Sequence, residues 1–235
     1  MSGRPGRLAA AGLGAALLGL LAACEPPAPV IGATPLTPLP EPVANNAVAL
    51  AGPADAPVIV SLMGLAAGRQ WSDVHARAWL LAPGAPAWER LPDVPGPGGR
   101  LAGTAVGLAD AVLLFGGYTV AGDGGEVSVE RVQRLDLARR SWAELAPMPI
   151  PVDDSVALPY GDRYVYLVSG WHHSGNVNLV QAYDRLEDRW FQATPWPGPA
   201  VFGHAGGIVG DTMALCDGVG IESRVDEPRR FVAIA

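Results

Sequence analysis

Apolar runs that end at glycine recur along most of the chain. The runs VIVSLMG, AVLLFGG, YVYLVSG and TMALCDG end at Gly64, Gly117, Gly170 and Gly218, in steps of 53, 53 and 48 residues. Short segments that are rich in Val, Leu and aromatic residues and bounded by Gly, Asp and Pro are typical of β-strands. A repeat of this length indicates stacked units that cannot bury a core alone.

Tryptophans keep the same phase in every repeat. Trp88, Trp142 and Trp190 each lie seven residues after a bulky apolar residue, and spaced prolines follow them. Large aromatic side chains are more often structural than functional. We therefore expect all seven tryptophans of the chain to fill the core and the contacts between units, rather than to form a sugar platform.

Each repeat contains four predicted strands. In residues 101–149 they are LAGTAVGL, AVLLFGGY, SVERVQRLDL and SWAELAPMP, and no helical period is evident after the amino terminus. Four-stranded antiparallel units of this length are the blades of β-propellers. The sequence predicts an all-β fold whose blades span about 47–97, 98–149, 150–199 and 200–235, the last being incomplete.

The repeats resemble those of the kelch family. The marks are Gly116-Gly117 after an apolar strand, Val180-x-x-Tyr183-Asp184, and Trp190 seven residues after that tyrosine. The resemblance covers residues 47–235 and implies a kelch-type β-propeller, which closes into a ring of six or seven blades. The other repeats depart from the pattern because their glycine pair is reduced to Met63-Gly64, Ser169-Gly170 and Asp217-Gly218.

The fourth repeat is shorter than the others. VFGHAGGIVG and TMALCDG match the first two strands, and RRFVAIA matches the start of the third, which gives about 3.75 blades and an incomplete ring. Three explanations are open: a truncated or frameshifted gene, a fragment that another chain completes, or a closed four-bladed ring. We favour truncation, which would leave apolar blade faces and strand edges exposed.

The amino terminus predicts export. Arg4 and Arg7 precede an uncharged run, Leu8 to Ala23, which is typical of a signal peptide over residues 1–23. Leu21-Ala22-Ala23-Cys24 resembles the bacterial lipobox, which implies a diacylglyceryl group on Cys24. The alternative is an ordinary signal peptide with a chance cysteine. We expect a membrane-anchored lipoprotein of the bacterial cell envelope that faces the periplasm or the cell surface, with inner or outer membrane left open.

Proline-rich sequence follows the cysteine. Residues 25–42 contain seven prolines, so we interpret residues 24–46 as a lipidated tether, about 55 Å long if its proline-rich part is fully extended. The whole chain has a formal charge of −7, no lysine and no basic stripe, which argues against nucleic acid as a partner. Cys216 lies in an apolar strand, and we expect it to be buried.

Propeller topology brings the start of each first strand and the loop after each second strand to one end of the blades. Trp171 also falls at this end. The alternative is that these are ordinary solvated loop residues. The predicted ligand-binding residues there are Arg100, Asp153, Asp154, His172, His173, Phe202 and His204.

No catalytic set is secure in the sequence. His172 and His173 lack the ligand spacing of a zinc site, and the copper-site motif of galactose oxidase, which shares this propeller type, is missing. We predict neither a metal nor a cofactor. Asp153 and Asp154 could serve acid–base chemistry, but neighbours on a strand are expected to point to opposite faces.

The favoured function is a lipid-anchored, exported binding or scaffold module that presents its loops to a carbohydrate or protein ligand. The alternative is an enzyme of the sialic-acid mutarotase (epimerase) type, which this chain resembles in export and repeat type. A mutarotase needs only a positioned acid and base. Fold alone does not choose between these functions.

Overall fold

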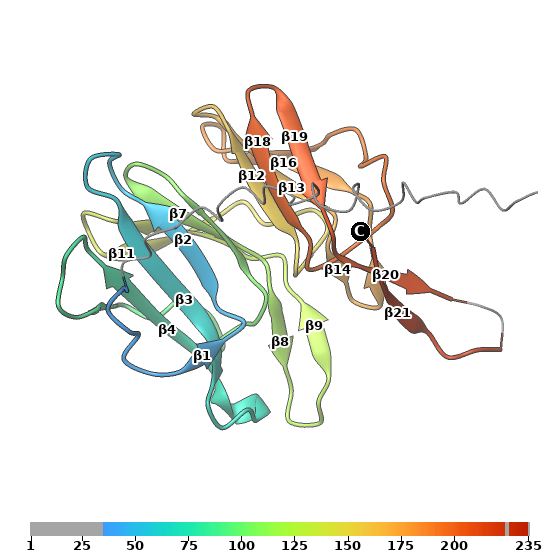
Figure 1. The fold of residues 1–235 in the computed structure, drawn as a ribbon, viewed down its shortest axis with the longest axis horizontal. Coiled ribbons are helices and arrows are strands. Elements are labelled where there is room, and N and C mark those ends of the chain that lie inside the picture. The colour runs from blue at the N-terminus through green and yellow to red at the C-terminus, as the bar shows by residue number, and fades with distance from the viewer. Residues whose placement is uncertain (1–34, 224–225, 235) are drawn as a thin grey trace, which may run out of the picture. The chain divides into compact units, whose positions relative to one another are not determined.

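The strands form one five-stranded and two four-stranded antiparallel sheets, and the first two strands of a fourth blade, in the order that the repeat predicts (Figure 1). The computed structural model describes residues 35–223 and 226–234. The chain divides into two units, Met1–Leu36 and Thr37–Ala235, and the second contains all the described strands. The predicted signal peptide and Cys24 lie outside the described residues.

Each sheet, which we call a blade, pairs its strands in chain order. The inner strands of consecutive blades lie beside one another, and the described blades do not close into a ring. The blades consist of β2 (Ala47–Ala51), β3 (Val58–Ala66), β4 (Val74–Leu81) and β5 (Glu89–Leu91); β6 (Thr104–Gly107), β7 (Ala111–Phe115), β10 (Val132–Asp136) and β11 (Ser141–Leu145); β12 (Val156–Tyr160), β13 (Tyr164–Val168), β16 (Val180–Asp184) and β17 (Arg189–Gln192); and β18 (Ala205–Val209) with β19 (Thr212–Cys216).

Short segments at the blade ends complete the element list. In blade one, β1 (Val43–Ala44) pairs with the end of β3, and the 3₁₀ turn η1 (Trp71–Asp73) leads into β4. In the other blades a hairpin follows the second strand. These hairpins are β8 (Tyr118–Val120) with β9 (Glu126–Ser128), β14 (Trp171–His172) with β15 (Gly175–Asn176), and β20 (Val219–Glu222) with β21 (Arg230–Ala233).

One predicted strand assignment is wrong. The segment RRFVAIA, matched to the third strand of blade four, contains β21, which pairs with β20 instead of β19. In the first repeat the long strands β3 and β4 take the place of the separate hairpin, so a third strand does follow the second there. β-strand patterning alone does not distinguish a hairpin arm from a third strand.

The cores lie between blades, and strand alternation builds them. Val112 and Leu114 of β7 pack into the core with blade one, whereas Leu113 and Phe115 pack into the core with blade three. Because both faces of this strand are covered, it reads as a continuous apolar run. Cys216 of blade four occupies the position that Phe115 has in blade two, and it is exposed. The prediction of a buried cysteine fails because no described blade packs on that face.

The repeated tryptophans join each blade to the segment before it. The indole N–H of Trp142 donates to the Pro92 carbonyl at 3.0 Å, and that of Trp190 donates to the Ala146 carbonyl at 2.8 Å. Trp88 makes the same bond to Thr37 at 2.9 Å. Residues of the predicted tether therefore contact blade one. Both Trp142 and Trp190 also pack against the inter-blade cores.

The reduced glycine pairs have a conformational reason. The first residue of each pair has φ between 55° and 59°, which other residues can adopt at a cost. The second has φ between 89° and 119° and is glycine in every repeat, because a Cβ there is strongly disfavoured. The pairs are Met63-Gly64, Gly116-Gly117, Ser169-Gly170 and Asp217-Gly218.

A second left-handed residue lies just before the inner strand of each blade. These residues are Asn45, Ala102, Asp154 and Gly203, with φ between 47° and 61°. Backbone N–H groups connect them from blade to blade: Ala102 to the Asn45 carbonyl at 3.3 Å, Asp154 to Ala102 at 3.1 Å and Gly203 to Asp154 at 2.9 Å. We call this set the axial chain.

Among the described residues no helix has the length and apolar character needed to cross a membrane.

The second glycine of the pair should be intolerant of a side chain. A Cβ at Gly117 would lie 2.6 Å from the Leu101 carbonyl oxygen, whereas a Cβ at Gly124 meets nothing within 4 Å, although both have φ near 87° (89° and 85°). We expect Gly117→Ala to lower the free energy of unfolding by about 3 kcal/mol and Gly124→Ala by about 1 kcal/mol. Urea denaturation measures both, and equal losses would contradict the packing argument.

Candidate functional site

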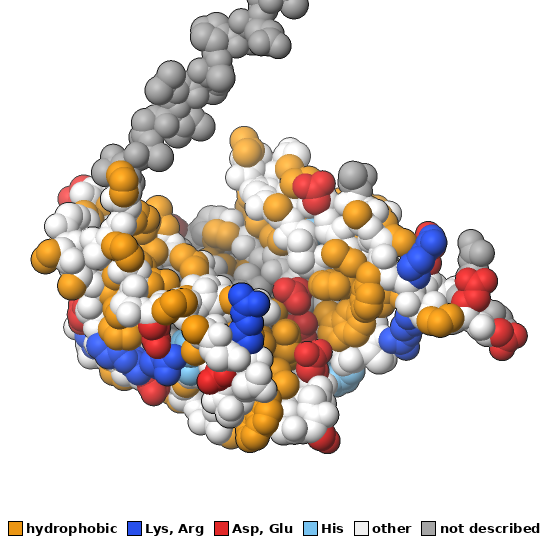
Figure 2. Space-filling view, turned by 60° about the horizontal axis from the view of Figure 1, so that its bottom comes forward, with side chains coloured by type: hydrophobic (Ala, Val, Ile, Leu, Met, Phe, Trp, Pro, Cys, Tyr) orange, Lys and Arg blue, Asp and Glu red, His pale blue; other side chains and the backbone are white. Residues whose placement is uncertain are grey.

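A pocket of about 200 Å³ lies at the predicted loop end of blades two to four. Figure 2 shows acidic side chains beside a hydrophobic patch in a hollowed face, in keeping with the lining of this pocket. The lining residues come from the β8–β9 hairpin, the start of blade three, β14, the start of blade four and β21. They are Tyr118, Glu126, Ser128, Asp153, Asp154, Trp171, Phe202 and Phe231.

The repeat itself places several of these residues. In blade three Asp153 forms an isolated β-bridge with Trp171, and in blade four Phe202 forms the same bridge with Val219. Each bridge joins the residue before the axial chain to the residue after the second glycine. The same two repeat positions therefore supply Asp153, Trp171 and Phe202 to the pocket.

Asp153 is the most perturbed group of the site. Asp153 is only 3% exposed, and no described residue donates a hydrogen bond to its Oδ2. Burial raises the pKa of Asp153 to about 7, the Ser128 hydroxyl opposes this, and the Asp154 and Glu126 carboxylates raise the pKa further. Asp153 is therefore poised to gain or lose a proton near neutral pH.

Asp154 shares the pocket with Asp153, contrary to the strand-alternation prediction. Asp154 has φ 47°, so the chain leaves the extended conformation there and the two neighbouring carboxylates line the same pocket. Burial, and then the Glu126 carboxylate, raise the pKa of Asp154. Burial and the same three carboxylates also raise the pKa of Tyr118 to about 12.

Three aromatic residues form one wall of the pocket. The Trp171 and Phe202 ring centroids are 5.5 Å apart at an interplanar angle of 75°, and Phe231 lies 6.1 Å from each of them. Edge-to-face contacts of this kind fix the rings relative to one another. The prediction that all tryptophans are core residues is wrong for Trp171, which is half-buried in the pocket, and for Trp71, which is 55% exposed.

Four predicted site residues do not line this pocket. Arg100 is buried and donates to the Gly116 carbonyl at 2.8 Å and to Gln133 at 2.5 Å, and burial lowers its pKa to about 10. His172 bonds the Pro151 carbonyl at 2.7 Å, and its ring lies 4.0 Å from that of His173. His204 is buried, which lowers its pKa. The structure thus brings together Asp153, Asp154 and Phe202 of the predicted set.

Sequence reasoning did not identify Tyr118, Glu126, Ser128 and Phe231 as site residues. Tyr118 directly follows the second glycine of its repeat, as Trp171 does, so the repeat phase could have identified it. Glu126 and Ser128 lie on β9, and Phe231 lies on β21. These hairpins were not distinguished from the blade strands in the sequence.

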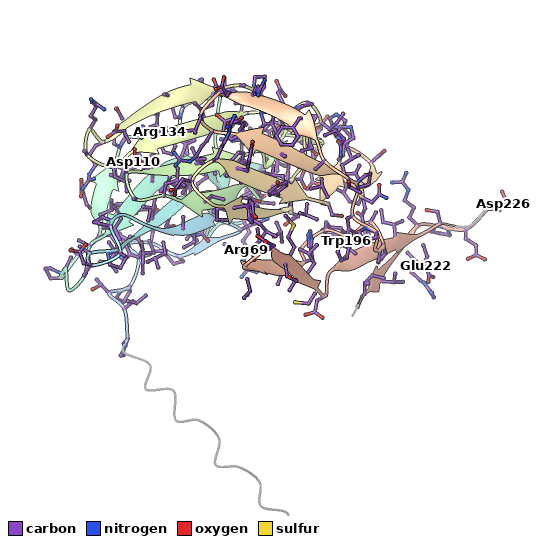
Figure 3. All side chains as sticks on the ribbon, turned by 90° about the horizontal axis from the view of Figure 1, so that it is seen from above. Arg69, Asp110, Arg134, Trp196, Glu222 and Asp226 are labelled. Atoms are coloured by element: carbon purple, nitrogen blue, oxygen red, sulfur yellow. The ribbon has the colours of Figure 1, made fainter. Side chains whose placement is uncertain are left out.

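The pocket carboxylates differ from those at the far end of the blades. Asp110, at the other end of β7, faces Arg134 at 2.6 Å (Figure 3). The groups that perturb Asp153 and Asp154 include no arginine. Within residues 35–223 and 226–234, no three His, Cys, Asp or Glu side chains are grouped so that they could hold a metal ion. The negative charge of the pocket can therefore be neutralised by a bound ligand or by protonation of the carboxylates.

Comparison with known proteins adds three findings. Kelch-like protein 15 of Gallus gallus is 30% identical over 108 residues, which are 46% of this chain and 22% of that protein. Kelch-like protein 4 of Homo sapiens is 33% identical over 64 residues, 27% of this chain and 9% of that protein. The matched segments thus span less than a quarter of these relatives. No family model matches the chain.

The solved structure of YjhT has the same fold. It aligns with a TM-score of 0.61 at 18% identity, covering 83% of this chain and 67% of that one. The blades and their axial order define a β-propeller protein. Together with the glycine pairs and phased tryptophans, these matches identify the repeats as kelch repeats, so the chain is a kelch-repeat β-propeller whose described sheets do not close.

The raised pKa of Asp153 should appear in the stability of the protein. Between about pH 4 and pH 7 the folded protein holds a proton on Asp153 that the unfolded chain has released, so stability falls as pH rises. Such a group costs up to about 1.4 kcal/mol per pH unit in this window. In urea denaturation, the free energy of unfolding of Asp153→Asn should fall less between pH 4.5 and pH 7.5 than that of the parent protein.

Asp110→Asn is the matched control, since it removes one carboxylate at the far end of the blades. It should keep the pH dependence of the parent protein. If Asp153→Asn also kept that dependence, the carboxyl group of Asp153 would not be perturbed.

Proposed function

We propose that the protein is an exported, lipid-anchored kelch-repeat binding module whose pocket holds a carbohydrate or a side chain of a protein ligand. The observation that carries this proposal is the pocket, where three aromatic rings and a buried carboxyl group border one concave site. Apolar walls with a few directed polar groups are the usual composition of ligand pockets. Its lining residues come mainly from loops and short hairpins, which vary more freely than blade strands.

The structure of the pocket gives the binding proposal a specific residue to test. Trp171 has the largest side chain in the lining, and it contacts Phe202 and Phe231. We expect Trp171→Ala to weaken ligand binding about tenfold, because a stacked aromatic contact contributes on the order of 1 kcal/mol. Ligands are found by applying the detergent-solubilised full chain to a glycan array and to a peptide array.

Trp79→Ala is the control for that experiment. Trp79 lies on β4 of blade one, where Arg90 stacks over its ring at 5.1 Å. Trp79→Ala therefore removes a tryptophan that does not line the pocket. It should leave binding unchanged. Equal weakening by the two substitutions would mean that the effect comes from general loss of stability.

The proposed anchor rests on the sequence alone. Cys24 follows Leu-Ala-Ala, and the proline-rich segment after it would hold the blades away from a membrane. A multiply acylated cysteine binds a membrane stably, whereas a single lipid chain does not.

The two cysteines of the chain allow a matched test of lipidation. We expect mass spectrometry of the protein from a bacterial host to show an acylated Cys24 at the mature amino terminus. Cys24→Ser should move the protein out of the membrane fraction, and Cys216→Ser should not. A parent protein with an unmodified amino terminus would contradict the proposal.

A sugar mutarotase remains the second candidate, because Asp153 has a pKa of about 7. A group that titrates near the working pH can both accept and donate a proton, as ring opening and closure of a sugar require. NMR exchange between the anomers of a reducing sugar separates the two functions. A binding module leaves the exchange rate at its uncatalysed value, whereas a mutarotase raises it and loses that effect in Asp153→Asn.

A further inference from the structure

Among the described residues, none that lines the pocket carries a positive charge to balance its carboxylates. Asp153, Asp154 and Glu126 all face the pocket, and its other lining residues are neutral. The nearby cationic candidates are directed elsewhere: Arg100 bonds Gly116 and Gln133, and His172 bonds Pro151. Bringing like charges together without a counter-charge is unfavourable, and a bound cation would relieve it.

One buried oxygen of Asp153, a residue that lines the pocket, lacks a hydrogen-bond donor. Oδ2 of Asp153 receives no hydrogen bond from any described residue, and the residue is 97% buried, since 3% is exposed. A buried acceptor without a donor is unfavourable, because it has given up its hydrogen bonds to water. An N–H donor from a ligand would remove that cost, and a charged donor would form a stronger bond than a neutral one.

The aromatic wall suits the apolar part of an organic cation. Trp171, Phe202 and Phe231 contact one another on the side of the pocket next to the carboxylates. Aromatic rings attract cations through the negative potential of their faces, and Trp is the strongest of them. A bare metal ion fits this lining poorly, because the described residues offer no metal-binding group of three or more ligands.

Other ligand classes satisfy only part of the site. A neutral sugar hydroxyl could donate to Asp153 but would leave three acidic groups without a counter-charge. An anionic sugar would be repelled by them. An ammonium group supplies both the donor and the charge, and the carbon skeleton next to it covers the aromatic wall.

We propose that the pocket binds the protonated primary amine of an organic ligand, with the ammonium group against Asp153 and the adjoining carbon chain against Trp171, Phe202 and Phe231. This inference rests on the proposed binding function and names its ligand chemistry. Such an amine occurs in amino sugars and in alkylamines such as the lysine side chain, and the experiment separates the two sources.

The test is isothermal titration calorimetry of the detergent-solubilised full chain with two pairs of probes. The first pair is 1,5-diaminopentane and 1,5-pentanediol, and the second is glucosamine and N-acetylglucosamine. We expect at least one amine to bind at least tenfold more tightly than its uncharged counterpart. The pair that shows the difference identifies an alkylamine or an amino sugar.

Variants tie that binding to the pocket. Asp153→Asn should weaken the amine at least tenfold, and Glu126→Gln, at an exposed position that tolerates change, should weaken it about threefold. Asp110→Asn, the remote carboxylate, should have no effect. Affinity should also rise between pH 5.5 and pH 8, because Asp153 must lose its proton to pair with the amine. Asp154, whose pKa is also raised, acts in the same direction, and the Glu126 carboxylate and the Tyr118 hydroxyl face the same carboxylates.

Two results would overturn the inference. If an uncharged probe or an array ligand bound as tightly as the amines and required Trp171 but not Asp153, the pocket would be a binding site of another chemistry, and the proposed function would stand. If no amine bound and no array ligand depended on Trp171, both the inference and the proposed function would fail.

Discussion

Backbone hydrogen bonds between left-handed residues hold successive blades together near the propeller axis. In blades one to four the residues of the axial chain have φ between 47° and 61°, and from blade two onward the N–H of each donates to the carbonyl of the one before it. A backbone that turns in this way cannot also continue the strand ladder. The inner strand of each blade therefore begins just after this residue. In blades two to four, the residue just before it pairs only through an isolated β-bridge at the end of the blade.

The pocket is a consequence of that turn. Because Asp154 is part of the axial chain, its left-handed conformation places it on the same side as Asp153. The paired glycine position then brings Trp171 opposite Asp153 through a single β-bridge. Asp154 thus serves both the axial chain and the pocket. A substitution that disturbs the axial chain at Asp154 would alter both the packing of the blades and the carboxylate pair.

The repeat predicts the blades well because its information is periodic. Glycine spacing, tryptophan phase and alternating apolar residues follow directly from inter-blade packing, as Phe115 and Trp190 show by sharing one core at 5.9 Å. The hairpins were less predictable, since the pattern of β21 matches that of a third strand. Cys216 was misjudged because burial depends on a neighbouring blade and not on the strand alone.

The sequence predicted the end of the blades at which the pocket lies, but not all the residues that line it. Topology correctly indicated which end of the blades carries Asp153, Asp154 and Phe202, whereas the side-chain directions of Arg100 and His204 depended on local packing. Tyr118 and Trp171 occupy equivalent positions after the second glycine, so the repeat phase that placed Trp171 at this end could also have placed Tyr118 there. A left-handed residue is difficult to infer when it is Ala or Asp instead of Gly.

Amide hydrogen exchange tests the axial chain most directly. The amides of Ala102, Asp154 and Gly203 bond across blades, whereas the amide of Gly124 bonds Ala121 within an exposed hairpin turn at 2.9 Å. If the axial chain holds the blades together, the three axial amides should exchange only when blades separate, at rates far below that of Gly124. Exchange of the axial amides as fast as that of Gly124 would contradict the account.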